Sequence, residues 1–78
     1  MAAEAIVERV RREYADAWHD DVLAALDRYG TEPYHHEIVR VQHAILDLAA
    51  GDPEELEEMV QAAVIDYRDV LYWQTLDR

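Results

Sequence analysis

Apolar residues recur at spacings of three and four positions along most of the chain, which is the pattern of amphipathic helices. The stretch 53–74 is the clearest case. Its apolar positions form one stripe along a helix: Leu56, Met59, Val60, Ala63, Tyr67, Val70 and Leu71. The alternation of apolar and polar residues that marks a half-buried strand does not occur. The chain is therefore predicted to be all-α.

Two junctions rich in Gly and Pro divide the chain, at residues 30–33 and 51–53. In each, a Gly can end one helix in the left-handed conformation and a Pro can begin the next. Asp52 is a favourable N-cap, and Glu55 three residues later completes a capping box. The sequence therefore predicts helices over about 33–50 and 53–74.

The predicted helix 33–50 has an unusually wide apolar arc. One face carries Tyr34, Ile38, Val41, Ala44, Ile45 and Leu48, and two more residues widen it, Val39 and Leu46. A wide arc suits a helix that has neighbours on two sides. This helix is therefore expected to have neighbours on two of its sides.

The first segment, 3–29, starts on one stripe and continues on another that is rotated by roughly a quarter turn. The sequence His19-Asp20-Asp21 stands at the change, where we expect a kink or a break with Asp20 or Asp21 capping a second helix. The helices are then about 3–18 and 20–29. The expected fold of residues 1–78 is a single domain, a small antiparallel bundle of three helices, or of four if the first is broken.

Length and charge narrow the function classes. A chain of 78 residues buries only about 60–65% of its unfolded surface, so pairing with a second copy is a natural way to gain burial. Its 18 acidic residues against seven Arg give a net charge of −11, which repels phosphates and argues against nucleic-acid binding. In the first helix, Arg9 and Glu13 have the spacing of an exposed ion pair.

The composition of the chain allows expectations about the cellular location of the protein and about the organism that it comes from. No apolar run is long enough to span a membrane, and the first residues lack the apolar region of a secretory signal. There is no Cys, and with it no disulfide framework or cysteine zinc site. We expect a cytoplasmic protein, and the abundance of Ala with the absence of Lys, Asn and Phe hints at a bacterium with GC-rich DNA.

The four histidines raise the question of a metal site. Asp16 and His19, like Glu32 and His35, have a carboxylate-x-x-His spacing found in helical di-metal proteins. The expected inward-facing Glu partners are missing, however, so no metal or cofactor is predicted. A candidate polar face opposite the core, formed by His36, Arg40, His43 and Asp47, is interpreted as solvated. The alternative is a metal-binding or enzymatic module built at a dimer cleft around His35, His36 and His43.

Residues suited to catalysis are scarce. The chain has no Ser, Cys or Lys and no Gly-rich phosphate loop, so no catalytic residue is assigned. The acidic cluster 54–58 is explained by the helix dipole at an N-terminal turn. Its alternative interpretation is an acidic inhibitor, or a DNA mimic, that binds a basic protein.

The last helix carries a second set of large residues away from its core stripe. Ile65, Tyr72 and Leu76 fall on the side that should face water, with Arg68 at its edge. The Arg68 guanidinium can lie on the Tyr72 ring, or pair with a carboxylate of a preceding helix. Either these residues pack on segment 3–29 or they form an interface. We expect a non-enzymatic protein–protein interaction module that associates with itself, with Ile65, Arg68, Tyr72 and Leu76 as candidate interface.

The sequence of residues 40–73 adds a resemblance. It reads R-V-Q-x-A-I-L-x-L, then a Gly-Asp turn, then D-Y-R-D-V-L-x-W, with Asp66 to Leu71 and Trp73 as the most specific block. In this it resembles a class of small uncharacterised bacterial all-α proteins. The chain departs from their pattern after Trp73, where an Ala is expected and Gln74 stands. The resemblance implies a small bacterial helical protein and adds no mechanism.

Overall fold

The structure is a computed structural model that describes residues 3–32 and 35–76. These residues form four α-helices and a short 3-10 helix: α1 (Glu4–Glu13), η1 (Asp16–Trp18), α2 (His19–Asp27), α3 (Ile38–Ala49) and α4 (Pro53–Leu76). They contain no strand. The predicted all-α bundle is confirmed, in its four-helix form. No helix within the described ranges has the length and apolar character needed to cross a bilayer.

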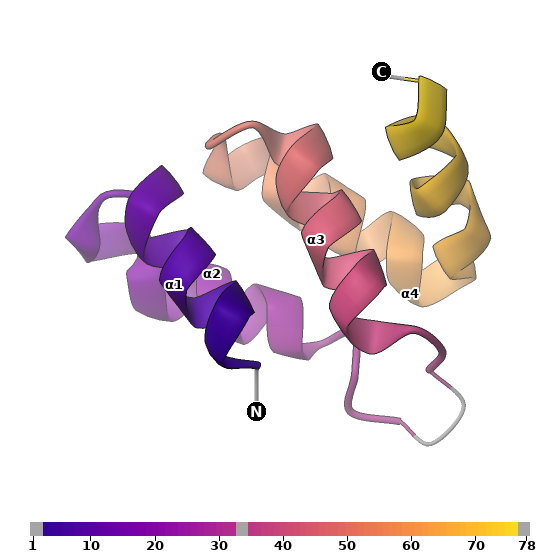
Figure 1. The fold of residues 1–78 in the computed structure, drawn as a ribbon, viewed down its shortest axis with the longest axis horizontal. Helices are drawn as coiled ribbons and strands as arrows, with labels where there is room; N and C mark the ends of the chain where they lie inside the picture. The colour runs from indigo at the N-terminus through magenta and orange to yellow at the C-terminus, as the bar shows by residue number, and fades with distance from the viewer. Residues whose placement is uncertain (1–2, 33–34, 77–78) are drawn as a thin grey trace.

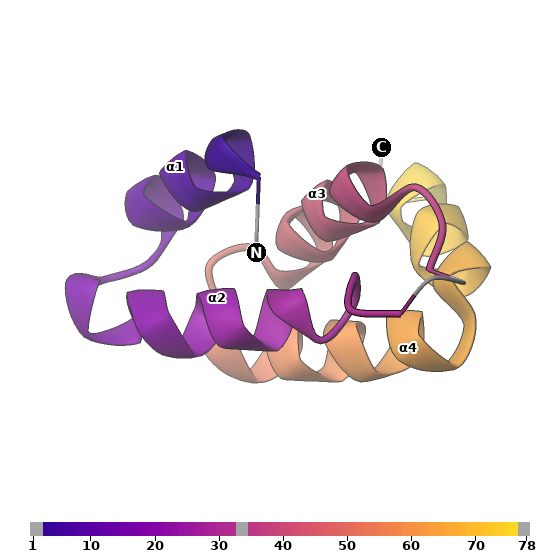
Figure 2. The same cartoon turned by 90° about the horizontal axis from the view of Figure 1, so that it is seen from below.

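The helices lie in two layers. One layer holds α1 and α3, and the other holds α2 and the first part of α4 (Figure 2). The chain reverses direction between consecutive helices (Figure 1). The most extensive contact is between α3 and α4, and α3 also packs against α1. The expectation that α3 has neighbours on two sides is therefore confirmed.

A single cluster of apolar side chains fills the space between the layers. Four of the inward positions predicted for the last helix are buried, namely Leu56, Val60, Ala63 and Val70. The other three are partly buried against the same core: Met59, Tyr67 and Leu71. In α3, Leu46 is buried and widens the apolar arc as expected, whereas Val39 is 43% exposed. Nearly every residue that the periodicity predicted to face inward is thus buried or partly buried in this small core.

The break in the first segment lies earlier than the expected position at residues 19–21. The backbone is already extended at Tyr14 and Ala15, and His19 is the first residue of α2. The His19 ring Nε2 lies 2.8 Å from the Tyr14 carbonyl oxygen, which the end of α1 leaves without a helical partner. Asp20 and Asp21, the two predicted caps, therefore both lie inside the first turn of α2 and do not cap it.

Helix α3 begins at Ile38, five residues after the predicted start. Glu37 has a left-handed backbone with φ of 50°, which ends the preceding loop. The Tyr29 hydroxyl accepts a hydrogen bond from the His36 N–H at 3.2 Å and donates one to the His36 carbonyl at 2.7 Å, holding that loop to the end of α2. Pro33 and Tyr34, which the pattern placed in the first turn, lie outside the described residues.

The turn between α3 and α4 follows the prediction closely. Asp52 Oδ1 accepts a hydrogen bond from the Glu54 N–H at 2.9 Å, which confirms the N-cap. Gly51 has φ of +82°, and a Cβ there would lie 3.3 Å from the Glu13 carbonyl oxygen. The turn thus contacts the end of α1. Burial in this contact, together with the charges of Glu13 and Asp52, raises the pKa of Tyr14 to about 12.

A buried glutamine connects α3 to the end of α2. Gln42 donates through its side-chain amide to the carbonyls of Leu26 and Tyr29, at 3.0 and 3.1 Å. The Leu26 carbonyl lies in the last turn of α2 and also accepts the Tyr29 N–H at 3.1 Å, whereas the Tyr29 carbonyl lies two residues beyond the helix. Gln42 therefore adds side-chain donors at the C-terminal end of α2.

We expect Gln42→Leu to lower the free energy of unfolding by about 1–3 kcal/mol, because the Tyr29 carbonyl loses its side-chain donor and the Leu26 carbonyl keeps only its backbone donor. Urea unfolding followed by circular dichroism measures the change. The same substitution at Gln61, which is exposed on α4, is the matched control and should change stability by less than about 0.5 kcal/mol. Equal effects of the two variants would contradict this role of Gln42 at the end of α2.

Candidate interaction surface on α4

Helix α4 is interrupted at Asp66, which sequence reasoning missed when it predicted one helix over 53–74. The Asp66 backbone is extended, with φ of −156° and ψ of 102°, in the middle of otherwise helical residues. Its Oδ1 accepts a hydrogen bond from the Arg68 N–H at 3.1 Å. This is the geometry of an N-cap, so Asp66 ends one helical segment and begins the next.

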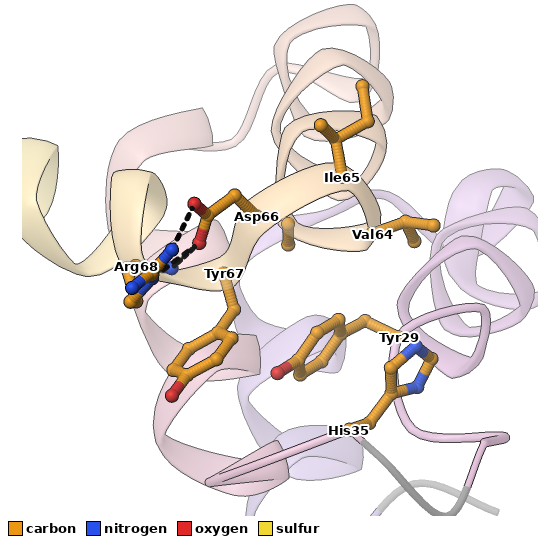
Figure 3. A pocket seen from close by; sticks show the side chains of 8 residues that line it. Tyr29, His35, Val64, Ile65, Asp66, Tyr67 and Arg68 are labelled. Carbon is orange, nitrogen blue, oxygen red and sulfur yellow. Dashed lines mark hydrogen bonds and ion pairs between the residues drawn. The ribbon is translucent and has the colours of Figure 1, made fainter.

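Asp66 also forms an ion pair with the side chain of Arg68. The guanidinium Nε lies 3.0 Å from Oδ1 and Nη2 lies 3.0 Å from Oδ2, an arrangement in which both carboxylate oxygens are used (Figure 3). These hydrogen bonds hold the pKa of Asp66 below its ordinary value and raise that of Arg68. Arg68 therefore pairs with Asp66 and not with either predicted partner, the Tyr72 ring or a carboxylate of a preceding helix. The interruption of the helix brings the Asp66 carboxylate within reach of the Arg68 guanidinium.

The predicted interface residues lie on the surface. Ile65 is 85% exposed, and Tyr72 and Leu76 are each 62% exposed. Val64 and Trp73 are about half exposed. In the part of the chain that the structure describes, five of the seven exposed large apolar residues thus lie between positions 64 and 76. The alternative, packing of this stripe on segment 3–29, does not occur for these exposed side chains.

The interruption also changes the geometry of this stripe. Ile65 belongs to the segment before Asp66, and Tyr72 and Leu76 belong to the segment after it. Because the helical phase restarts at Asp66, the single stripe predicted from a continuous helix is wrong. In the second segment, Leu76 is a neighbour of both Tyr72 and Trp73, since residues four and three positions apart lie next to each other on a helix.

A shallow cavity of about 340 Å³ lies beside the interruption and is lined by aromatic side chains (Figure 3). The His35 ring stacks on Tyr29 with ring centroids 4.5 Å apart, and its Nδ1 accepts a hydrogen bond from the Gly30 N–H at 2.8 Å. Tyr67 lies 6.3 Å from Tyr29 between ring centroids. His35 therefore fixes the loop between α2 and α3, which is a structural role.

The predicted polar face divides into two parts. His36 and Arg40 are exposed, and Arg40 pairs with Glu37 at 2.8 Å. His43 and Asp47, which were expected to be solvated, are instead partly buried against Arg9 of α1. The expectation was wrong for these two because it placed all neighbours of α3 on its apolar side, whereas α1 packs at the edge of the polar side.

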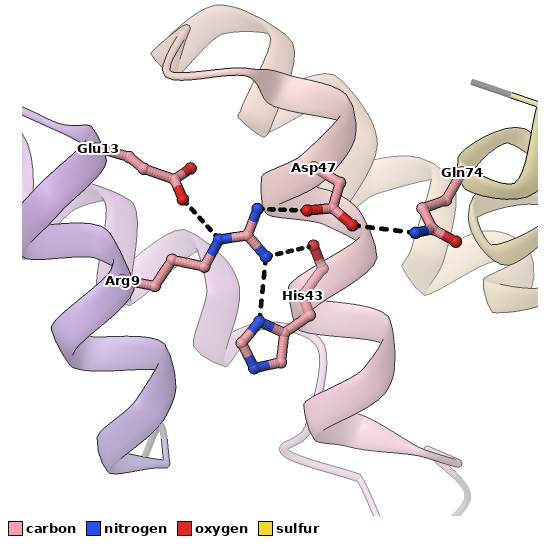
Figure 4. Close-up of polar contacts among 5 residues, drawn as sticks. All are labelled: Arg9, Glu13, His43, Asp47 and Gln74. Atoms are coloured by element: carbon pink, nitrogen blue, oxygen red, sulfur yellow. Dashed lines mark hydrogen bonds and ion pairs between the residues drawn. The ribbon is translucent and has the colours of Figure 1, made fainter. Parts of the chain in front are cut away.

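Arg9 is the centre of a polar network that connects three helices (Figure 4). It pairs with Glu13, as the spacing predicted, and with Asp47, and it donates to the His43 carbonyl at 3.1 Å. Asp47 in turn accepts a hydrogen bond from the Gln74 side chain at 3.0 Å. Burial alone lowers the pKa of Arg9, but the two carboxylates outweigh it and raise the pKa. The network therefore holds the end of α4 in place.

The described residues were compared with the arrangement that a metal site requires. Within residues 3–32 and 35–76, no three His, Asp or Glu side chains are arranged so that they could hold one metal ion. Comparison with protein-family models, with curated proteins and with solved structures finds no match for the chain. The resemblance of residues 40–73 to small bacterial helical proteins stays a prediction.

We expect Arg9→Ala to lower the free energy of unfolding by about 1–3 kcal/mol, because Asp47 and Glu13 lose a partly buried cation. Urea unfolding measures this change. Arg11→Ala on the exposed side of α1 removes the same charge and should cost less than about 0.5 kcal/mol. If both variants lose the same stability, net charge rather than the network determines the effect.

The cap at Asp66 can be separated from its ion pair. Asp66→Ala removes both and should lower stability, whereas Asp66→Asn keeps an N-cap acceptor and should lower it less.

Because the pKa of Asp66 is lowered in the folded state, its stabilisation is present above the unfolded-state pKa and is lost as pH falls through the folded-state pKa. Thermal unfolding at pH 7 and at pH 3 checks both points. A more stable alanine variant would show that the chain favours an uninterrupted α4.

Proposed function

We propose that this protein is a non-enzymatic protein–protein interaction module that associates with itself through α4. The self-association surface consists of Val64, Ile65, Arg68, Tyr72, Trp73 and Leu76. One observation carries the proposal: these positions hold five of the seven exposed large apolar side chains among the described residues. Exposed apolar side chains gathered on one element are typical of interfaces.

The residue types on this surface favour protein–protein binding rather than catalysis. Tyr, Trp and Arg are enriched at protein interfaces, because they combine large contact area with a hydrogen-bonding group. The surface contains each of them. Its charged pair, Asp66 with Arg68, has no net charge and both partners are already hydrogen-bonded. An approaching protein surface therefore meets apolar groups and a satisfied ion pair, not an isolated charge.

A second copy of the chain is the favoured partner. A stable interface buries about 800 Å² on each partner, roughly a sixth of the accessible surface of 5026 Å². A twofold axis places the same apolar side chains of both copies against each other, which requires no complementary partner surface. A domain with a small core also gains proportionally more from added burial than a large one does.

The net charge of −11 on each copy opposes this association and gives it a characteristic salt dependence. Repulsion between two acidic copies is long-range and is screened by salt, whereas apolar contact is not. We therefore expect the dimer to tighten when the salt concentration is raised. Association through ion pairs between copies would weaken instead.

Sedimentation velocity of the whole protein, in low salt and in about 0.5 M NaCl, tests the proposal. We expect dimers at micromolar concentration, more of them in high salt, and their loss in Ile65→Glu and Tyr72→Glu. Val39→Glu is the matched control, because Val39 is an exposed apolar residue on α3 and the substitution adds the same charge. It should leave the dimer intact.

Two results would contradict the proposal. A wild-type protein that stays monomeric at high micromolar concentration and high salt excludes self-association. Equal loss of dimer in Val39→Glu and Ile65→Glu shows that added charge, not the α4 surface, controls assembly. Circular dichroism of each variant ensures that a monomer is a folded monomer.

A further inference from the structure

A second apolar groove lies at the opposite end of α4, between the start of that helix and α2. Its volume is about 490 Å³, and its apolar lining comes from Trp18, Val22, Ala25, Pro53 and Leu56. The two helices run side by side in the same layer (Figure 2). Leu56 precedes Ile65 by nine residues, or about 14 Å along a helix, so the groove and the self-association surface are distinct.

The rim of this groove is acidic. Asp21 on α2 and Glu54, Glu57 and Glu58 on α4 line it, and no Arg of the described residues does. One acid is compensated, because Glu57 pairs with Arg28 at 2.7 Å. Asp21, Glu54 and Glu58 are exposed. Carboxylates on both sides of an apolar floor create a negative potential that attracts a cationic group and repels phosphate.

Trp18 adds an aromatic face at the edge of the groove. It is 46% exposed, although it is one of the two largest side chains in the protein. Its position in η1 places it beside both the apolar floor and Asp21. A Lys or Arg that approaches the rim can therefore contact an indole ring as well as carboxylates.

We propose that this groove binds a short, basic amphipathic segment of another protein. One or two large apolar side chains of that segment enter the groove, and its Lys or Arg residues pair with Asp21, Glu54 and Glu58. A second copy of the chain is a poor occupant. Its arginine-rich stretch lies in α1, where Arg9 is engaged in the polar network and Val10 is in the core.

The test uses a model peptide of about 14 residues, made of Leu and Lys in the order that gives an amphipathic helix. Trp73→Phe leaves Trp18 as the sole tryptophan, so its emission reports on the groove. We expect saturable binding with a blue shift of Trp18 emission. A scrambled peptide of the same composition should bind at least tenfold more weakly, because it lacks an apolar face.

Paired acid variants locate the site. Glu54→Gln with Glu58→Gln should weaken binding of a fluorescent form of the peptide about five- to tenfold at low salt. Glu4→Gln with Glu8→Gln removes the same charge from exposed positions of α1 and should change the affinity less than twofold. Trp18→Ala, measured by the same peptide anisotropy, should also weaken binding.

Three outcomes would overturn this proposal. The first is peptide binding without any change in Trp18 emission. The second is equal weakening by the two pairs of acid variants, which would mean attraction by net charge alone. The third is equal affinity for the amphipathic and the scrambled peptide, which would mean that the apolar groove is not used.

Discussion

The arrangement of the exposed apolar residues on α4 depends on the interruption that Asp66 caps in the middle of that helix. Its side chain accepts the Arg68 N–H and pairs with the Arg68 guanidinium, so the extended backbone at this point is held by the residue itself. The interruption separates a first segment of α4 from a second segment that continues in a new direction (Figure 1). The change of direction between Ile65 and the face that carries Tyr72 and Leu76 is a consequence of this interruption.

The second segment is held in its new direction by the buried Val70 and by polar contacts. Gln74 donates to Asp47, and Asp47 pairs with Arg9, so the position of the end of α4 is coupled to α1 through α3. In a protein with 18 acidic residues and seven Arg, a partly buried Arg shared by two carboxylates compensates charge where the helices meet. The residues left on the outside are then free to serve as contact surface.

The periodicity of apolar residues predicted the fold class, most of the core and the cap at Asp52, because these depend on local sequence and burial. The interruption at Asp66 was missed because residues 53–74 keep apolar spacings of three and four through it. The Asp at position 66 with another at 69 is an N-cap signal within that stretch. The roles of His43, Asp47 and Gln42 depend on which helices are neighbours, and periodicity along one helix carries no such information.

The central claim is that exposed apolar residues on both sides of Asp66 form the contact between two copies of the chain. Isotope-filtered NMR on a mixture of labelled and unlabelled protein measures such contacts directly. The account predicts nuclear Overhauser effects between copies at the methyl groups of Ile65 and Leu76 and the ring of Tyr72. Contacts between copies that involve Trp18 or Val39 instead, or none at a concentration where dimers are present, would contradict it.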